Sequence, residues 1–156
     1  MLGVCFGHQL IAQALGGEVA PGDQGEELGA QTMMLTEAGR RDALFHQLPE
    51  NMTTMQSHED VVTELPDGAA RLASSRSTSC QAFALGTTIR AVQFHPEFTV
   101  EHMTFILNRE RAEQEQTGVD VDKLIAELKP TEAARNVLQN FERFFMDRKR
   151  ELPGDD

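Results

Sequence analysis

The feature that most constrains the fold is the segment Gly3-Val4-Cys5-Phe6-Gly7, which joins a short apolar run to a helix-forming run. Residues 2–5 are typical of the end of a buried strand, and residues 8–16 predict a helix that Gly16-Gly17 closes. A strand that turns directly into a helix strains the backbone at the turn, and glycines two positions to either side let the chain close around it. The pattern is that of a nucleophile elbow with cysteine as the nucleophile. Taken alone, the five residues also fit a buried structural cysteine between two ordinary glycines.

The predicted turn gives the Cys5 thiol two kinds of electrostatic support. The thiol would lie at the N-terminus of the following helix, where the helix dipole favours the thiolate. The backbone N–H of Phe6, the next residue, would point toward an oxyanion that develops during attack on a carbonyl. Both effects suit a cysteine that attacks an acyl group.

A second motif, His95-Pro96-Glu97, follows a run at 89–94 that has the composition of a strand. A period of two places Gln93, His95 and Glu97 on one side of that strand. The carboxylate can then accept from one imidazole nitrogen, which leaves the other nitrogen to take a proton from a nucleophile. By itself the motif is also typical of a simple turn. Cysteine, histidine and glutamate together match nucleophile, base and orienting group.

Together, the segment from Gly3 to Gln9 and the segment from Gln93 to Glu97 resemble a class I (triad) glutamine amidotransferase domain. The resemblance implies that the cysteine attacks the side-chain amide of glutamine, releases ammonia and leaves a γ-glutamyl thioester that water hydrolyses. By this resemblance Cys5 is the nucleophile, His95 is the acid and base, and Glu97 orients His95. The resemblance also assigns one oxyanion-hole amide to Phe6 and part of the hold on substrate glutamine to Gln9.

The resemblance extends to the middle and the end of the chain. The segment Gln56-Ser57-His58-Glu59-Asp60 resembles the Ser-His-x-Asp segment that lines the glutamine pocket in GMP-synthase-like members, so Ser57 and His58 are predicted to bind substrate. Residues 65–83 and 129–141 continue the likeness to stand-alone, GMP-synthase-like amidotransferases. The resemblance therefore covers nearly the whole chain.

The remaining patterns predict strands within 17–36 and at 52–57 and 70–75, and a hairpin from 80–85 and 88–94. A short helix is predicted at 41–48, and longer helices at 99–115, 120–128 and 131–150. The last of these has an apolar stripe, which we expect to pack on the chain's own sheet; the alternative is a surface for a partner. The stripe consists of Ala134, Val137, Leu138, Phe141, Phe144 and Phe145.

The resemblance implies an α/β, flavodoxin-like three-layer sandwich with a central, mostly parallel sheet. Residues 1–156 are expected to form a single domain whose C-terminal helices occupy 99–150. A complete domain of the family carries further strands and a glycine-rich loop before the elbow, and that loop supplies the second oxyanion-hole amide. The domain is therefore expected to be truncated at its N-terminus. Loss of one oxyanion donor typically costs about 10²–10³ in kcat.

Composition narrows the partners and the compartment. The 156 residues include 25 acidic and 14 basic ones, a net charge of −11, so nucleic acids and anionic membranes are unfavourable partners. Two cysteines form no disulfide framework, and we expect a reducing cytoplasm and a structural role for Cys80. The histidines lack ligand spacing and no nucleotide-binding motif is present, so neither a metal nor a cofactor is predicted.

Three functions compete. The first is a glutamine amidotransferase that passes ammonia to a separate synthase subunit. The second is a γ-glutamyl peptide hydrolase that uses the same triad and thioester; the lack of a synthetase-like sequence after the domain favours it slightly. The third is a catalytically inactive fragment or partner-binding module that retains only the motifs. The sequence identifies neither an ammonia acceptor nor an oligomeric state.

Overall fold

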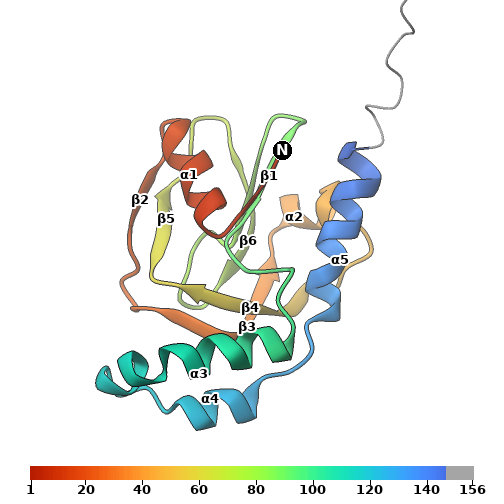
Figure 1. The fold of residues 1–156 in the computed structure, drawn as a ribbon. Helices are drawn as coiled ribbons and strands as arrows, with labels where there is room; N and C mark the ends of the chain where they lie inside the picture. Colours follow the sequence, from red (N-terminus) through yellow and green to blue (C-terminus); the bar gives the residue numbers. More distant parts are fainter. Residues whose placement is uncertain (147–156) are drawn as a thin grey trace, which may run out of the picture.

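A six-stranded sheet forms the centre of the computed structural model, which describes residues 1–146 (Figure 1). Its strands, in spatial order, are β1 (Leu2–Val4), β8 (Ile89–Val92), β7 (Ala82–Leu85), β6 (Ala70–Ser75), β3 (Glu27–Leu35) and β4 (Asn51–His58). A smaller antiparallel sheet pairs β2 (Glu18–Pro21) with β5 (Asp60–Glu64). The chain therefore has the α/β character that the sequence predicts.

The prediction of a mostly parallel sheet is wrong. Only β1 and β8 run parallel, and the other four neighbouring pairs of the large sheet are antiparallel. For two of these pairs the reason is the length of the connections: β6, β7 and β8 follow one another through short turns, which join antiparallel neighbours. The predicted hairpin of residues 80–85 and 88–94 is confirmed as the β7–β8 pair.

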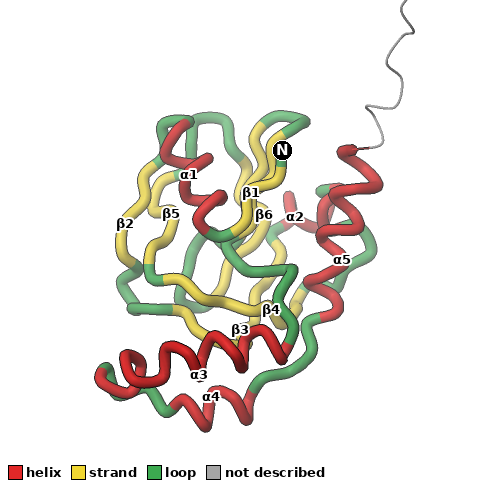
Figure 2. Tube along the Cα trace, viewed as in Figure 1, coloured by secondary structure: helices red, strands yellow, loops and turns green. Residues whose placement is uncertain are grey.

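Helices cover both faces of the large sheet (Figure 2). On β7, Phe83 packs with Ala12 of α1 (Phe6–Ala14). Its neighbours Ala82 and Ala84 join the opposite core together with Val137 of α5 (Glu132–Phe141). Helices α3 (Val100–Gln116) and α4 (Val121–Glu127) form a third core against β3 and β4. The alternation along β7 thus links the elbow helix to one face and the C-terminal helix to the other.

The apolar stripe near the C-terminus packs on the chain's own sheet, as predicted. Ala134 and Val137 are fully buried, and Phe141 and Phe145 pack against the same core, whereas Leu138 is 36% exposed. Helix α5 continues as the π-helical turn η2 (Glu142–Met146). The part of the predicted helix at 147–150 lies outside the described residues.

Two local predictions differ from the structure. The helix predicted at 41–48 is replaced by the 3₁₀ turn η1 (Ala43–Phe45), and the helix α2 (Glu37–Arg41) precedes it and reaches the predicted region only at Arg41. Side-chain caps explain the break: the Thr36 hydroxyl accepts from the Gly39 N–H, and the Asp42 carboxylate accepts from the Leu44 N–H. Strand β5 was not predicted, because its β-branched run is only three residues long, Val61 to Thr63, and its pairing with β2 is a tertiary contact.

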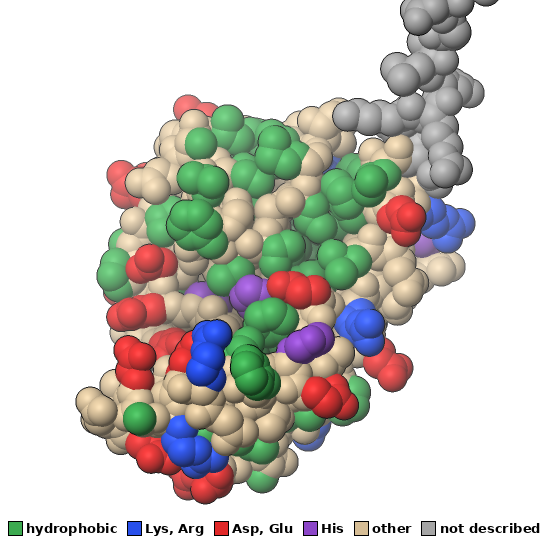
Figure 3. Space-filling model, in the orientation of Figure 1, with side chains coloured by type: hydrophobic (Ala, Val, Ile, Leu, Met, Phe, Trp, Pro, Cys, Tyr) green, Lys and Arg blue, Asp and Glu red, His purple; other side chains and the backbone are tan. Residues whose placement is uncertain are grey.

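Among the described residues, strand β1 lies at an edge of the large sheet and pairs with β8 alone. Hydrophobic side chains gather over β1 and α1 on one face of the molecule (Figure 3), where Phe6 is 71% exposed and Leu10 54% exposed. That the domain lacks front strands stays a prediction. Within residues 1–146, no helix has the length and apolar character needed to cross a membrane.

Candidate active site

Cys5 lies at the turn from β1 to α1, as the elbow pattern predicts. Its φ of 49° and ψ of −107° fall in a strained region, and its N–H donates to the Val92 carbonyl at 2.9 Å. A Cβ on Gly3 would lie 2.6 Å from Ile11 Cδ1 and 2.7 Å from the Gly7 carbonyl oxygen, whereas a Cβ on Gly7 would meet nothing within 4 Å. The close approach of strand and helix therefore requires glycine at Gly3 but not at Gly7.

The Cys5 sulfur lies between an acceptor and a donor. Cys5 Sγ donates to the Ser57 carbonyl at 3.7 Å, and Gln93 Nε2 donates to the sulfur at 3.8 Å. The carbonyl suits a protonated thiol, while the amide N–H suits a thiolate. Gln93 is fully buried, so the donor is held in place. The sulfur is therefore contacted by one acceptor and one donor.

His95 and Glu97 form the hydrogen-bonded pair that the second motif predicts. His95 Nδ1 lies 2.7 Å from Glu97 Oε1, which leaves Nε2 as the other working nitrogen. The imidazole stacks on the Phe98 ring at a centroid distance of 4.0 Å and an interplanar angle of 6°. The backbone N–H of His95 donates to the Met55 carbonyl at 2.9 Å, which ties this loop to β4. The imidazole is thereby held by Glu97 at one ring nitrogen and by Phe98 at its face.

Electrostatics couple the two motifs. Burial lowers the pKa of His95, but interactions with the side chains of Cys5 and Glu97 outweigh it and raise that pKa to about 9. For Glu97, burial raises the pKa, but the hydrogen bond and charge of His95, a backbone hydrogen bond and the charge of His102 together outweigh it and the net pKa is lowered. An imidazolium beside a cysteine sulfur is the arrangement on which cysteine nucleophiles depend.

The predicted substrate-binding residues differ in which of their polar groups remain available to a substrate. Phe6 is the first residue of α1, so its N–H has no intrahelical acceptor and is free for an oxyanion. Gln9 is 8% exposed and donates from Nε2 to Asp60 O at 2.8 Å and to Gln93 Oε1 at 3.3 Å. Both amide protons of Gln9 are therefore used within the protein, and only its Oε1 remains for substrate.

Ser57 and His58 lie side by side in sequence but in different surroundings. Ser57 reaches Cys5 through its backbone carbonyl. The His58 side chain is only 2% exposed, and its ring faces Glu27 and the Asp60 carbonyl rather than open space. The structure thus brings the Ser57 carbonyl into contact with Cys5, whereas the His58 ring contacts Glu27 and Asp60 instead.

Sequence reasoning did not assign Gln93 and Glu27 to the site. Gln93 carried a usable signal, since it shares a strand side with His95 and interrupts an apolar run. Glu27 carried none, because the four side chains that donate hydrogen bonds to it lie 48 to 54 residues further along the chain.

His8 and Cys80 form a buried contact away from the triad. Burial lowers the pKa of His8 to about 3, and burial raises the pKa of the Cys80 thiol to about 12. Cys80 Sγ lies 3.7 Å from His8 Nε2. A thiol that stays protonated agrees with the structural role predicted for Cys80. Among residues 1–146, no group of three or more histidine, cysteine or acidic side chains is arranged to hold a metal.

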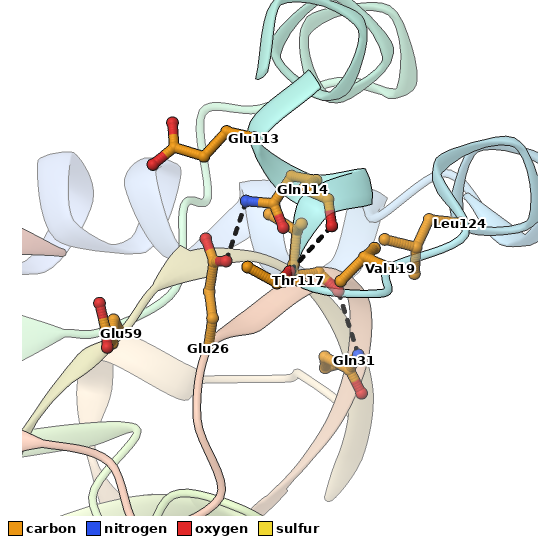
Figure 4. A pocket seen from close by; sticks show the side chains of 9 residues that line it. Glu26, Gln31, Glu59, Glu113, Gln114, Thr117, Val119 and Leu124 are labelled. Atoms are coloured by element: carbon orange, nitrogen blue, oxygen red, sulfur yellow. Dashed lines mark hydrogen bonds between the residues drawn. The ribbon is translucent and has the colours of Figure 1, made fainter. Parts of the chain in front are cut away.

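A cavity of about 490 Å³ lies between the start of β3 and the C-terminal end of α3 (Figure 4). There Gln114 Nε2 donates to Glu26 at 2.9 Å, and Leu28 and Leu124 supply apolar lining. None of the lining residues belongs to the predicted site, so this cavity is separate from the triad.

The comparisons with known proteins agree with this geometry. Residues 1–112 match the family model described as glutamine amidotransferase class-I. The chain therefore belongs to the class I glutamine amidotransferase family.

The relatives include γ-glutamyl peptidases and GMP synthases. The chain is 32% identical to γ-glutamyl peptidase 5 of Arabidopsis thaliana over 70% of its length, and 31% identical to γ-glutamyl peptidase 4 over 97%. It is 42% identical to the glutamine-hydrolysing GMP synthase of Lacticaseibacillus rhamnosus over 62% of its length. These matches span 44%, 61% and 18% of the respective relatives. A crystal structure of a glutamine amidotransferase from Thermotoga maritima superposes with a TM-score of 0.77 at 28% identity, over 92% of this chain and 61% of that one.

Proposed function

We propose that this protein hydrolyses the side-chain amide of glutamine through a γ-glutamyl thioester on Cys5. The observation that carries the proposal is His95, whose Nδ1 is bound to Glu97 at 2.7 Å and whose pKa is raised to about 9 by Cys5 and Glu97 against the effect of burial. A nucleophile, a base and an orienting carboxylate that interact in this order support acyl transfer.

The reaction follows from these positions. His95 takes the proton of the Cys5 thiol, the sulfur attacks the amide carbon, and the Phe6 N–H donates to the oxyanion that forms. Protonated His95 gives its proton to the leaving nitrogen, the C–N bond breaks, and ammonia departs. His95 then takes a proton from water, which attacks the thioester and releases glutamate and the cysteine. We assign Gln9 Oε1 and the Ser57 carbonyl as acceptors for N–H groups of the substrate. His58 contacts the Asp60 carbonyl, which also binds Gln9.

Two fates of the chemistry fit the family. In one, ammonia passes to a separate synthase subunit. In the other, the protein cleaves γ-glutamyl peptides and needs no acceptor. The matches to γ-glutamyl peptidases cover 70% and 97% of the chain, against 62% for the GMP synthase, which supports the peptide substrate as the second candidate.

An electrophilic glutamine analogue tests the nucleophile directly. We expect one covalent adduct on the wild-type protein, found by mass spectrometry on the peptide that contains Cys5. The adduct should vanish in Cys5→Ser and persist in Cys80→Ser, which removes the buried thiol instead. A folded wild-type sample that gives no adduct would support a catalytically inactive chain and overturn both enzymatic proposals.

Substrate preference separates the two enzymatic candidates. Ammonia release from glutamine and cleavage of γ-glutamyl dipeptides are measured on the same preparation. Dominant cleavage of dipeptides contradicts the amidotransferase assignment, and dominant ammonia release contradicts the peptidase assignment.

Glu97→Ala should lower the rate less than Cys5→Ser or His95→Ala. The reason is that Phe98 stacking and the Met55 hydrogen bond also hold His95, so orientation is partly redundant while the nucleophile and the base are not. The measurement is kcat/KM for the three variants. Equal losses would show that Glu97 has a larger, structural role.

A further inference from the structure

Glu27 is a buried carboxylate surrounded by donors. It is 5% exposed, yet its oxygens accept hydrogen bonds from Ser75 Oγ at 2.8 Å, Thr78 Oγ1 at 2.7 Å and Gln81 Nε2 at 2.6 Å, and from the Ser77 hydroxyl. Every one of these groups donates, so the site is shaped for an anion. Burial raises the pKa of Glu27, but the interactions with His58 and the three hydroxyls outweigh it and lower that pKa to about 2.

The His58 ring lies between two acceptors. Its Nε2 is 3.1 Å from Glu27 Oε2, and its Nδ1 is 3.1 Å from the Asp60 carbonyl oxygen. Neither partner has a proton to give, and a neutral imidazole carries a proton on only one nitrogen. The Nδ1 contact is a hydrogen bond, whereas Nε2 approaches the Glu27 carboxylate at ion-pair distance without hydrogen-bond alignment. An unprotonated Nε2 would turn its lone pair toward that carboxylate, so the two contacts together favour protonation of both ring nitrogens.

His58 lies next to two backbone carbonyls, those of Ser57 and Asp60, that are linked to the nucleophile by hydrogen bonds. The Asp60 carbonyl accepts from both His58 Nδ1 and Gln9 Nε2, the latter at 2.8 Å. Gln9 Nε2 also donates to Gln93 Oε1, and Gln93 Nε2 donates to Cys5 Sγ. On the other side of His58, the Ser57 carbonyl accepts from the Cys5 thiol.

We infer that His58 is a buried imidazolium paired with Glu27, and that this ion pair positions the Ser57 and Asp60 carbonyls around Cys5. Glu27 and His58 are thus positioning residues, and their effect on catalysis rests on the proposed function above. The charge state of His58 does not depend on the proposed function.

The surroundings favour a single ion pair. On β3, Glu27 is the charged group that faces His58. From α1 the facing titratable group is His8, whose pKa burial lowers to about 3, so it stays neutral and does not oppose a charge on His58. A buried ion pair contributes little net stability compared with apolar residues of similar volume. The value of the pair therefore lies in the orientation of its neighbours.

Nitrogen NMR of the imidazoles tests the charge state without any assay of activity. In the wild-type protein at pH 7.5 we expect both His58 ring nitrogens to show the shifts of protonated imidazolium, with the resonances assigned by their loss in His58→Gln. In Glu27→Gln, one nitrogen should show the shift of an unprotonated imidazole. Glu127→Gln, an exposed substitution of equal charge change, should leave the His58 signals as they are. A neutral His58 in the wild-type protein overturns the inference, whether or not Glu27→Gln folds.

The positioning role is tested by the rate at which the electrophilic glutamine analogue modifies Cys5. In folded Glu27→Gln we expect this rate to fall about 10- to 100-fold, as for a small misplacement of reacting groups. It should be unchanged in Glu127→Gln. A protein with a charged His58 whose rate is insensitive to Glu27→Gln refutes the positioning role. If the wild-type protein forms no adduct, the proposed function fails while the NMR result for His58 remains valid.

Discussion

The position of the Cys5 sulfur is set by backbone geometry rather than by side-chain packing. A φ of 49° is costly for a residue with a Cβ, and it persists because β1 and α1 approach each other over Gly3. The strand is held to β8 through Val92, whose carbonyl accepts from the Cys5 N–H. The thiol is therefore fixed between Ser57 and Gln93 before any substrate arrives.

The coupling of Cys5 and His95 predicts how the histidine titrates. In the wild-type protein the His95 pKa should be about 9, and in Cys5→Ser it should fall, because burial then opposes the charge with Glu97 as the main remaining support. Ring carbon and proton shifts of His95, followed by NMR from pH 5 to 10, give both values. Cys80→Ser serves as the control, since that thiol contacts His8 instead.

The same coupling has a defined effect on stability. Because the folded-state pKa of His95 lies above its ordinary value of 6.5, the interaction stabilises the fold fully below pH 6.5 and is lost as the pH rises through about 9. A His95 that titrates near 6.5 in both proteins would contradict this account of the site.

At the level of elements, the sequence predicts what local signals determine. The β7–β8 hairpin and the helix after Cys5 have short-range patterns, and the structure contains both. The direction of the large sheet was mispredicted, because strand direction depends on connections that the resemblance assigned to a parallel core. Strand β5 was missed since only its pairing with β2 stabilises it.

The same distinction explains the site. The motifs indicate Cys5, His95 and Glu97, because each motif is contiguous in sequence. The carboxylate of Glu27 could not be found in this way, since Ser75, Thr78 and Gln81 reach it only after β3 and β6 have paired. Hydrogen-bond partners that are distant in sequence leave no local pattern.

Helix α3 is the element that follows the catalytic loop. It begins directly after Thr99, whose hydroxyl accepts from the His102 N–H, and it is anchored by Met103 and Leu107, both fully buried against β3 and β4. Because the His95 N–H is bonded to Met55 in the same core, the helix and the loop share their support.

Leu107→Ala should lower the free energy of unfolding by about 2–5 kcal/mol, the range for a buried leucine replaced by alanine. Phe105→Ala on the same helix is the control; Phe105 is 66% exposed, and its loss should cost less than about 0.5 kcal/mol. Urea denaturation followed by circular dichroism measures both. Similar effects of the two substitutions would show that α3 does not depend on its buried face.

For the molecule as a whole, the acidic composition matters most at low pH. Among the described acidic residues, Glu27 makes an unusually dense set of buried contacts that depend on its charge. Its carboxylate accepts four hydrogen bonds from donors in and after β6 and faces His58 at the end of β4. Protonation of this one group weakens contacts that join β3 to both of its neighbours.

Glu27→Gln should therefore flatten the acid limb of the stability profile. The folded-state pKa of Glu27, about 2, lies below its ordinary value of 4.5, so its contribution is present above pH 4.5 and is lost as the pH falls toward 2. Over that window the wild-type free energy of unfolding should fall more steeply than that of Glu27→Gln, by at most about 1.4 kcal/mol per pH unit for one proton. Urea denaturation at several pH values between 2 and 6 measures the slopes, and exposed Glu127→Gln should keep the wild-type slope. Parallel profiles for wild type and Glu27→Gln would mean that the buried carboxylate does not control acid unfolding, and that the links between β3 and its neighbours survive its protonation.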